Sequence, residues 1–241
     1  DSNYPPRAVQ GFHAKDELEL MMQRRSSRLP LSSAVINDKI VDRSYQHLAI
    51  RSITESLEEK NQRHSLIVMA TGSGKTRVVI ALVDLLTRCN WVKRVLFLAD
   101  RISLVKQASR EFGKHLSNTQ VVNLLKDHDA NGRVYVSTYQ TILNQINKLN
   151  NQTRKFGIGY FDLVIVDEAH RSIYSKYKGI FSYFDSYLIG LTATPKDEVD
   201  RNTYSLFQRE VQDPTYAFGL EEAIEGGYLV PPKAVSVPLS I

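Results

Sequence analysis

Residues 66–76 read Leu66-Ile67-Val68-Met69-Ala70-Thr71-Gly72-Ser73-Gly74-Lys75-Thr76, and this stretch decides the fold. Its four leading apolar residues predict a buried strand, and the apolar spacing over residues 78–86 predicts a helix directly afterwards. Glycines between the two allow backbone N–H groups to curl around phosphate oxygens, and the helix N-terminus adds a favourable dipole. A strand, a glycine turn that ends in Lys-Thr, and a helix together predict a phosphate-binding loop.

Each residue of this loop has a predicted role toward a bound nucleotide. Lys75 would reach the β- and γ-phosphates, and the Thr76 hydroxyl would hold Mg²⁺. The predicted nucleotide-binding residues of the loop are Thr71, Gly72, Ser73, Gly74, Lys75 and Thr76. The usual pattern has glycine five residues before Gly74, where this chain has Met69. The alternative is a glycine-rich turn that carries Lys-Thr by chance.

Four further apolar runs, at residues 95–98, 134–136, 163–166 and 188–191, alternate with helical patterns. The runs are continuous, as expected for strands that are buried on both faces of a parallel sheet. The alternation predicts an α/β fold with a doubly wound, mainly parallel sheet. Ligands of such sheets bind beyond the carboxyl ends of the strands, so the residues after each run are the candidates for function.

The run at residues 163–166 ends in Asp167-Glu168-Ala169-His170. A carboxylate at a buried strand end suits Mg²⁺ that keeps several waters, and we assign Asp167 to that role. Glu168 is placed to polarise an attacking water. Lys75, Asp167 and Glu168 are therefore the predicted catalytic residues. The alternative is a strand followed by an acidic helix start.

Composition excludes several classes of protein. The 241 residues are 42% hydrophobic and 24% charged, which is ordinary for a globular protein and excludes fibrous and wholly disordered chains. No apolar run approaches the roughly 20 residues needed to cross a bilayer. Cys89 is the one cysteine, so an internal disulfide is excluded.

Charge is uneven along the chain. Residues 65–160 carry 14 basic and 5 acidic side chains, whereas residues 161–241 carry 7 and 12. The basic middle could attract a polyanion through counterion release, and the alternative is a solubilising surface whose charge is uneven by chance. Residues 1–40 are predicted to form an irregular extension with one short helix near residues 16–24, and residues 41–241 to form the α/β domain.

The order of the motifs resembles that of superfamily 2 helicases and translocases. Besides the phosphate loop and the Asp-Glu-Ala-His strand end, matching stretches are Tyr45-Gln46 (the adenine-reading glutamine motif), residues 98–101 (motif Ia), residues 136–141 (motif Ib) and residues 191–195 (motif III). More narrowly, residues 11–13, 69–72, 94–101, 167–174 and 222–231 look like the motor subunit of type I restriction endonucleases. Met69 at the first loop position is usual in that family. The type III restriction subunit stays an alternative.

This resemblance implies the first RecA-like lobe of a motor that uses ATP and Mg²⁺ to pump double-stranded DNA before cutting it. Specificity and methylation subunits would be its partners, in the cytoplasm of a bacterium or archaeon. Residues 1–40 would link the lobe to a nuclease region. Because the arginine finger of such a motor belongs to a second lobe, we expect this chain alone to bind nucleotide but to hydrolyse little of it. The alternatives are a nucleotide-sensing module without motor activity and a metal-dependent nuclease that uses Asp167 and Glu168.

The resemblance also implies roles for residues outside the loop and strand end. Gln46 would pair with adenine N6 and N7. His170, Thr192 and Thr194 would couple the nucleotide to DNA contacts. Arg101 and Thr138 would touch DNA phosphates, which fix position without reading sequence. The simpler alternatives are a helix-surface glutamine, a structural histidine, an ordinary loop before Pro195, and solvated polar side chains.

Overall fold

The computed structural model describes residues 7–127, 131–147, 149–150, 153–169, 171–194 and 196–231. Within these residues, seven strands form one sheet in the order β3-β4-β2-β7-β8-β1-β9, and every neighbouring pair is parallel. The strands are β1 (His64–Met69), β2 (Val95–Ala99), β3 (Val121–Asn123), β4 (Val134–Thr138), β7 (Leu163–Val166), β8 (Tyr187–Thr192) and β9 (Tyr216–Phe218). All five apolar runs are strands of this sheet, so the predicted parallel α/β fold is confirmed.

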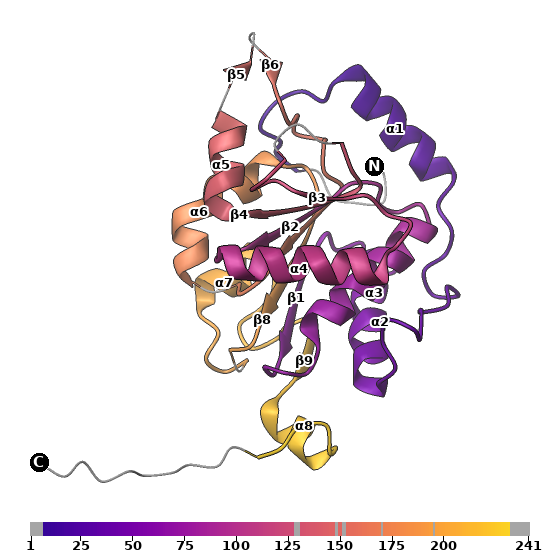
Figure 1. The fold of residues 1–241 in the computed structure, drawn as a ribbon, viewed down its shortest axis with the longest axis vertical. Helices are drawn as coiled ribbons and strands as arrows, with labels where there is room; N and C mark the ends of the chain where they lie inside the picture. Colours follow the sequence, from indigo (N-terminus) through magenta and orange to yellow (C-terminus); the bar gives the residue numbers. More distant parts are fainter. Residues whose placement is uncertain are drawn as a thin grey trace, which may run out of the picture.

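Helices cover both faces of the sheet (Figure 1). One face carries α2 (Ser44–Glu58), α3 (Lys75–Arg88) and α4 (Ile102–His115), and the other carries α5 (Tyr139–Asn147), α6 (Arg171–Tyr183) and α7 (Arg201–Leu206). Successive β1 residues alternate between the two cores, with Ile67 in the first and Leu66 in the second. Burial on both faces explains why the strand sequences are continuously apolar. A separate hairpin joins β5 (Leu149–Asn150) to β6 (Thr153–Arg154).

The chain before residue 41 packs against the domain. The predicted short helix is present as α1 (Lys15–Ser26). After it, Leu31, Ile36 and Ile40 are buried in the core beneath α2 and α3. Arg51 of α2 donates hydrogen bonds to the carbonyl oxygens of Leu31 (2.8 Å) and Ala34 (2.6 Å). Residues 31–40 therefore contribute core to the α/β domain.

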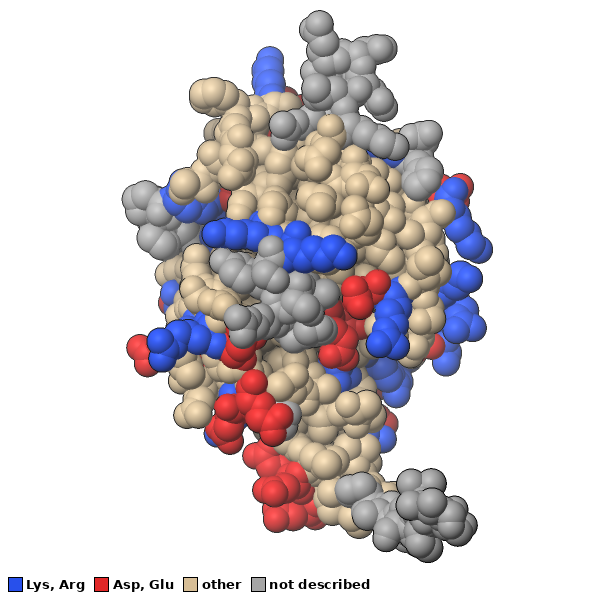
Figure 2. All heavy atoms as spheres, turned by 90° about the vertical axis from the view of Figure 1, so that its left-hand side faces the viewer, with Lys and Arg blue, Asp and Glu red and all other residues tan. Residues whose placement is uncertain are grey.

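Figure 1 shows α1 and α8 (Leu220–Glu225) toward opposite ends of the molecule. Figure 2 looks onto the side where α5, α6 and α7 lie, and acidic side chains gather toward its lower end. The helix α8, at that end, carries three glutamates, which fits the acidic balance of the last third of the sequence. Among the described helices, none combines the length and apolar character that crossing a membrane requires.

Candidate nucleotide-binding site

The predicted phosphate loop joins β1 to α3. Gly72 (φ 84°) and Gly74 (φ 88°) both adopt the left-handed backbone conformation that favours glycine. Gly74 is the N-cap of α3, so Lys75 and Thr76 begin the helix and the free backbone N–H groups of its first turn face the loop. Thr71 and Gly72 are exposed, whereas Thr76 is half-buried. The loop therefore has the backbone form that the sequence predicted.

Side chains from α2 hold the loop in this form. The Ser73 carbonyl oxygen accepts hydrogen bonds from the Tyr45 hydroxyl (2.7 Å) and from Gln46 Nε2 (3.1 Å). The Ser73 hydroxyl is buried and donates to the Ala70 carbonyl oxygen (2.6 Å), so it closes the loop on itself. Gln46 is 2% exposed, and its Oε1 has no hydrogen-bond partner within the described residues. In this structure the Gln46 amide supports the loop, and its role toward adenine stays a prediction.

The substitution Gly74→Ala is expected to lower the free energy of unfolding by about 1–2 kcal/mol, because the left-handed conformation is costly for any residue with a Cβ. That Cβ would also lie 2.6 Å from Gln46 Nε2 and displace its bond to the loop. Gly113→Ala is the matched control, since Gly113 lies inside α4 with open space around it. Alanine there should be neutral or stabilising by up to about 1 kcal/mol. Urea denaturation of both variants checks this, and an equal effect of the two would contradict it.

The amine of Lys75 is electrostatically coupled to both predicted carboxylates. Its Nζ donates to the Met69 carbonyl oxygen at 3.1 Å, back toward the end of β1. Burial lowers the pKa of Lys75, while the charges of Glu168 and Asp167 act on the same amine in the opposite direction. The loop follows β1 and the acidic residues follow β7, and β8 pairs with both strands, so the loop and the acidic strand end lie at the same side of the sheet.

Asp167 is a half-buried carboxylate at the end of β7. The Asp167 backbone N–H donates to the Leu98 carbonyl oxygen (2.9 Å), and the Asp167 backbone carbonyl oxygen accepts a hydrogen bond from the Tyr139 hydroxyl (2.7 Å). Burial, together with the charge of Glu168, raises the pKa of Asp167 to about 6, against the opposing effect of Lys75. The ionised form is therefore held at an energetic cost, which a nearby cation would reduce.

Glu168 follows in an unusual backbone conformation, with φ at 55°. Non-glycine residues seldom adopt positive φ, and such residues cluster at functional sites. The turn lets the chain leave β7 sharply, so that Asp167 and Glu168 both lie within electrostatic range of Lys75. No three His, Cys, Asp or Glu side chains group into a metal site within the described part of the chain. A cation here would therefore also need the Thr76 hydroxyl, waters or phosphate oxygens as ligands.

The carboxyl end of β8 lies between those of β7 and β1, because β8 pairs with both strands. The segment that begins at the end of β8 and carries the predicted coupling residues Thr192 and Thr194 therefore starts between Lys75 of the phosphate loop and the acidic strand end. Thr192 is fully buried, and its hydroxyl accepts a hydrogen bond from the Thr194 backbone N–H (3.1 Å). His170, the third predicted coupling residue, lies outside the described residues.

The two predicted DNA-contacting residues differ in exposure. Arg101 is exposed at the N-cap of α4, beyond the carboxyl end of β2. Thr138, at the end of β4, is 8% exposed, and its hydroxyl lies 2.9 Å from the Thr141 hydroxyl. It also accepts from the Thr141 backbone N–H (3.3 Å), so it supports the first turn of α5. Arg101 is therefore the more accessible of the two, and the contact of either residue with DNA stays a prediction.

Sequence reasoning missed a second group of residues that supports the loop. The Tyr45 ring stacks on Phe218 of β9, with centroids 4.0 Å apart, and Arg43 Nη1 donates to the Tyr45 hydroxyl (2.9 Å). The Ala70 backbone N–H donates to the Phe218 carbonyl oxygen (3.0 Å), and Leu229 lies against Gly72. An aromatic residue directly before Gln46 was the available signal for this contact.

Comparison with known proteins places the chain in a family. The family model described as "Type III restriction enzyme, res subunit" matches residues 39–197. The EcoAI endonuclease subunit of a type I restriction enzyme from Escherichia coli is 30% identical over 89% of this chain and 27% of that subunit. The EcoKI endonuclease subunit from Escherichia coli K12 is 29% identical over 78% of this chain and 17% of its own length.

A solved structure agrees with these relatives. A fragment described as an HsdR subunit of a type I restriction enzyme from Vibrio vulnificus YJ016 superposes with a TM-score of 0.58 and 27% identity, over 92% of this chain and 39% of that fragment. The resemblance to type I restriction endonuclease subunits is thereby confirmed. The chain spans about a quarter or less of the two curated relatives. With its phosphate loop and acidic strand end at one edge of a parallel sheet, the chain belongs to the family of the type III restriction enzyme res subunit.

Proposed function

We propose that the chain binds ATP with Mg²⁺ and is the first motor lobe of a type I restriction enzyme subunit that translocates double-stranded DNA before cleavage. The observation that carries this proposal is the placement of the phosphate loop after β1 and of Asp167-Glu168 after β7, at the carboxyl ends of the two strands that flank β8. A pure phosphate-binding loop needs no carboxylates, whereas a site that holds a metal-bound triphosphate needs both signs of charge.

The residues of the site fit this ligand. Left-handed Gly72 and Gly74 direct backbone N–H groups around a phosphate, and the first turn of α3 adds its dipole. Lys75 would bind the terminal phosphates, and Thr76 and Asp167 would hold the magnesium, directly or through water. Mg²⁺, when bound, neutralises phosphate charge and orients the β- and γ-oxygens. Glu168 would orient the attacking water and accept its proton.

The names of the relatives support the proposed partners. They are endonuclease subunits of type I restriction enzymes, so duplex DNA and the specificity and methylation subunits of such a complex are the proposed partners of this chain. We also propose that residues 1–40 connect to a nuclease region and that the protein works in the cytoplasm. The type III restriction subunit is the second candidate, because its family model matches residues 39–197.

Two measurements test the proposal. The 241-residue chain is expected to bind a fluorescent ATP analogue in the presence of Mg²⁺, and to lose that binding when EDTA is added. In the full-length protein, duplex DNA is expected to stimulate ATP hydrolysis, and Arg101→Ala to remove the stimulation while ATP binding persists. Failure to bind ATP would overturn the nucleotide site. ATP binding with no effect of DNA would favour the nucleotide-sensing module.

A further inference from the structure

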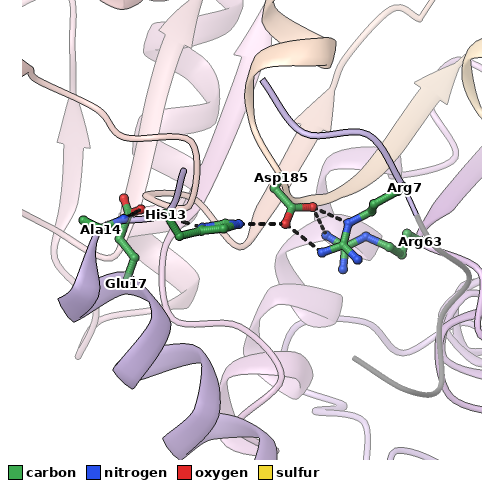
Figure 3. A network of polar contacts seen from close by, with 6 residues as sticks. All are labelled: Arg7, His13, Ala14, Glu17, Arg63 and Asp185. Carbon is green, nitrogen blue, oxygen red and sulfur yellow. Dashed lines mark hydrogen bonds and ion pairs between the residues drawn. The ribbon is translucent and has the colours of Figure 1, made fainter. Parts of the chain in front are cut away.

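Figure 3 shows a network of basic side chains around one buried carboxylate, that of Asp185, which precedes the start of β8. The Asp185 carboxylate accepts from Arg7 Nε (2.6 Å), Arg7 Nη2 (2.7 Å) and Arg63 Nη2 (3.0 Å), and His13 Nε2 lies 3.1 Å away. Arg7, Arg63 and Asp185 line a cavity of about 790 Å³ to which Lys60 also contributes. In this cavity the Asp185 carboxylate faces Arg7 and Arg63, while Lys60 pairs with Glu55 (2.8 Å).

A second cavity, of about 250 Å³, adjoins the first, because Arg7, Arg63 and Asp185 line both. The end of α1 and the residues after it add three more arginines to it, namely Arg24, Arg25 and Arg28. The Arg28 guanidinium lies 4.5 Å from the Trp91 ring centroid, and its Nη2 donates to the Tyr187 hydroxyl (3.2 Å). Its Nε is buried and has no hydrogen-bond partner within the described residues.

A shallow hollow continues from the second cavity, with which it shares Arg24 and Asp162. Lys93 and Arg94 line this hollow, and the Arg94 guanidinium lies 4.4 Å from the Tyr160 ring centroid. One Asp162 oxygen accepts from the backbone N–H groups of Lys93 (2.8 Å) and Arg94 (2.9 Å), and the other pairs with Arg24. These contacts of both Asp162 oxygens therefore involve groups other than the side chains of Lys93 and Arg94.

The two cavities and the hollow follow one edge of the sheet, which we call the amino-edge track. Its lining includes the residues that directly precede four neighbouring strands. These are Arg94 before β2, Asp162 before β7, Ser186 before β8 and Arg63 before β1. The track therefore crosses the amino ends of these strands, whereas the phosphate loop lies at their carboxyl ends. Strands lie about 4.8 Å apart, so the track is about 14 Å long, which matches roughly four nucleotides of B-form DNA.

The charge of the track is its second distinguishing property. Its lining includes eight Lys or Arg and three Asp or Glu residues, a net charge of +5. This positive excess lies on one elongated surface, where a polyanion of matching shape would gain from it.

We propose that the amino-edge track binds the sugar-phosphate backbone of a nucleic acid, as a second contact surface separate from the motor site. Guanidinium groups pair bidentately with phosphate oxygens, and six of the eight basic residues are arginines. Aromatic rings hold Arg28 and Arg94 in place, which reduces the entropy lost on binding. A phosphate-tracking surface predicts binding without sequence preference and with strong salt dependence.

The test measures the affinity of the 241-residue chain for a short labelled DNA duplex by fluorescence anisotropy. The titrations are made without ATP and at several salt concentrations. The variant Arg25→Gln/Lys93→Gln removes two charges from the track, at the exposed Arg25 and the half-buried Lys93. The control Lys39→Gln/Arg201→Gln removes two exposed charges elsewhere. The track variant is expected to reduce the slope of log K against log salt by about 2 relative to the unmodified chain, and the control to leave the slope unchanged.

Equal slopes for the two double variants would overturn the proposal, as would DNA binding that Arg101→Ala alone abolishes. Stronger competition by polyglutamate than by unlabelled DNA would also overturn it, because the track would then suit an acidic protein segment. Thermal unfolding confirms that both double variants fold. Binding of the ATP analogue by the track variant should equal that of the unmodified chain, so a defect at the nucleotide site is distinguished from one at the track.

Discussion

The substitution Asp185→Asn is expected to lower the free energy of unfolding by about 3 kcal/mol. Removing one partner of a buried ion pair typically costs about 3–5 kcal/mol, because the remaining charge stays buried without compensation. The Asp185 side chain is 4% exposed and Arg63 14%, but Arg7 is 32% exposed and partly screened by solvent, which favours the lower end of that range. Urea denaturation at neutral pH measures the effect.

A matched control is Asp213→Asn. Asp213 pairs with Arg209 at 2.8 Å, but its side chain is 64% exposed, so the loss should stay below about 1 kcal/mol. The effect at Asp185 should also depend on pH. Hydrogen bonding to Arg7 and the charges of Arg63, Arg7 and His13 lower the pKa of Asp185 below its ordinary value of 3.8, although burial acts in the opposite direction.

A lowered pKa in the folded state means that the carboxylate stabilises the protein above the unfolded-state value. That stabilisation is lost as the pH falls through the lower, folded-state pKa. The difference between the unmodified chain and Asp185→Asn should therefore be constant near neutrality and shrink below about pH 4. A difference that stays constant down to that acid range would show that packing, and not the charge of Asp185, causes the effect.

The substitution Lys75→Met is expected to weaken the affinity for MgATP about 30- to 100-fold, which corresponds to about 2–3 kcal/mol, the size of a charge-assisted hydrogen bond. Methionine keeps an apolar stem and removes the ammonium group. Because burial lowers the pKa of Lys75, the folded state disfavours its charge, and the variant should be as stable as the unmodified chain or more so. Titration with a fluorescent ATP analogue and a thermal melt without nucleotide separate the two effects.

The exposed Lys106 of α4 provides a control for this substitution. Lys106→Met removes the same charge and should leave the affinity for MgATP unchanged. An equal loss of affinity in both variants would indicate a general electrostatic effect of net charge, and the assignment of Lys75 to the terminal phosphates would then be wrong.

The sequence predicted the sheet because its central strands are buried on both faces and therefore continuously apolar. The same rule missed β3 (Val121–Asn123) and β9 (Tyr216–Phe218), which lie at the sheet edges and have three residues each. The burial of Leu31, Ile36 and Ile40 was also missed, since their spacing follows neither a helix nor a strand period. These residues are buried by contacts with α2 and α3, which no local pattern records.

The candidate nucleotide site could be proposed from the sequence at the residues that have local context. A glycine turn and an acidic strand end each follow an apolar run, so Lys75 and Asp167 could be found from the chain itself. Tyr45 supports the loop through Ser73 and stacks on Phe218, which lies far along the sequence. A contact of this kind depends on which strand lies next to β1, and that order is decided by the packing of the whole sheet.

The segment of residues 216–229 reaches the loop through three contacts, at Ala70, at Gly72 and at the Tyr45 ring. A force applied to the chain after Pro231 would therefore act first on residues 216–229, and through their contacts on the backbone of the phosphate loop. The conformation of the phosphate loop is therefore expected to respond to displacements of β9.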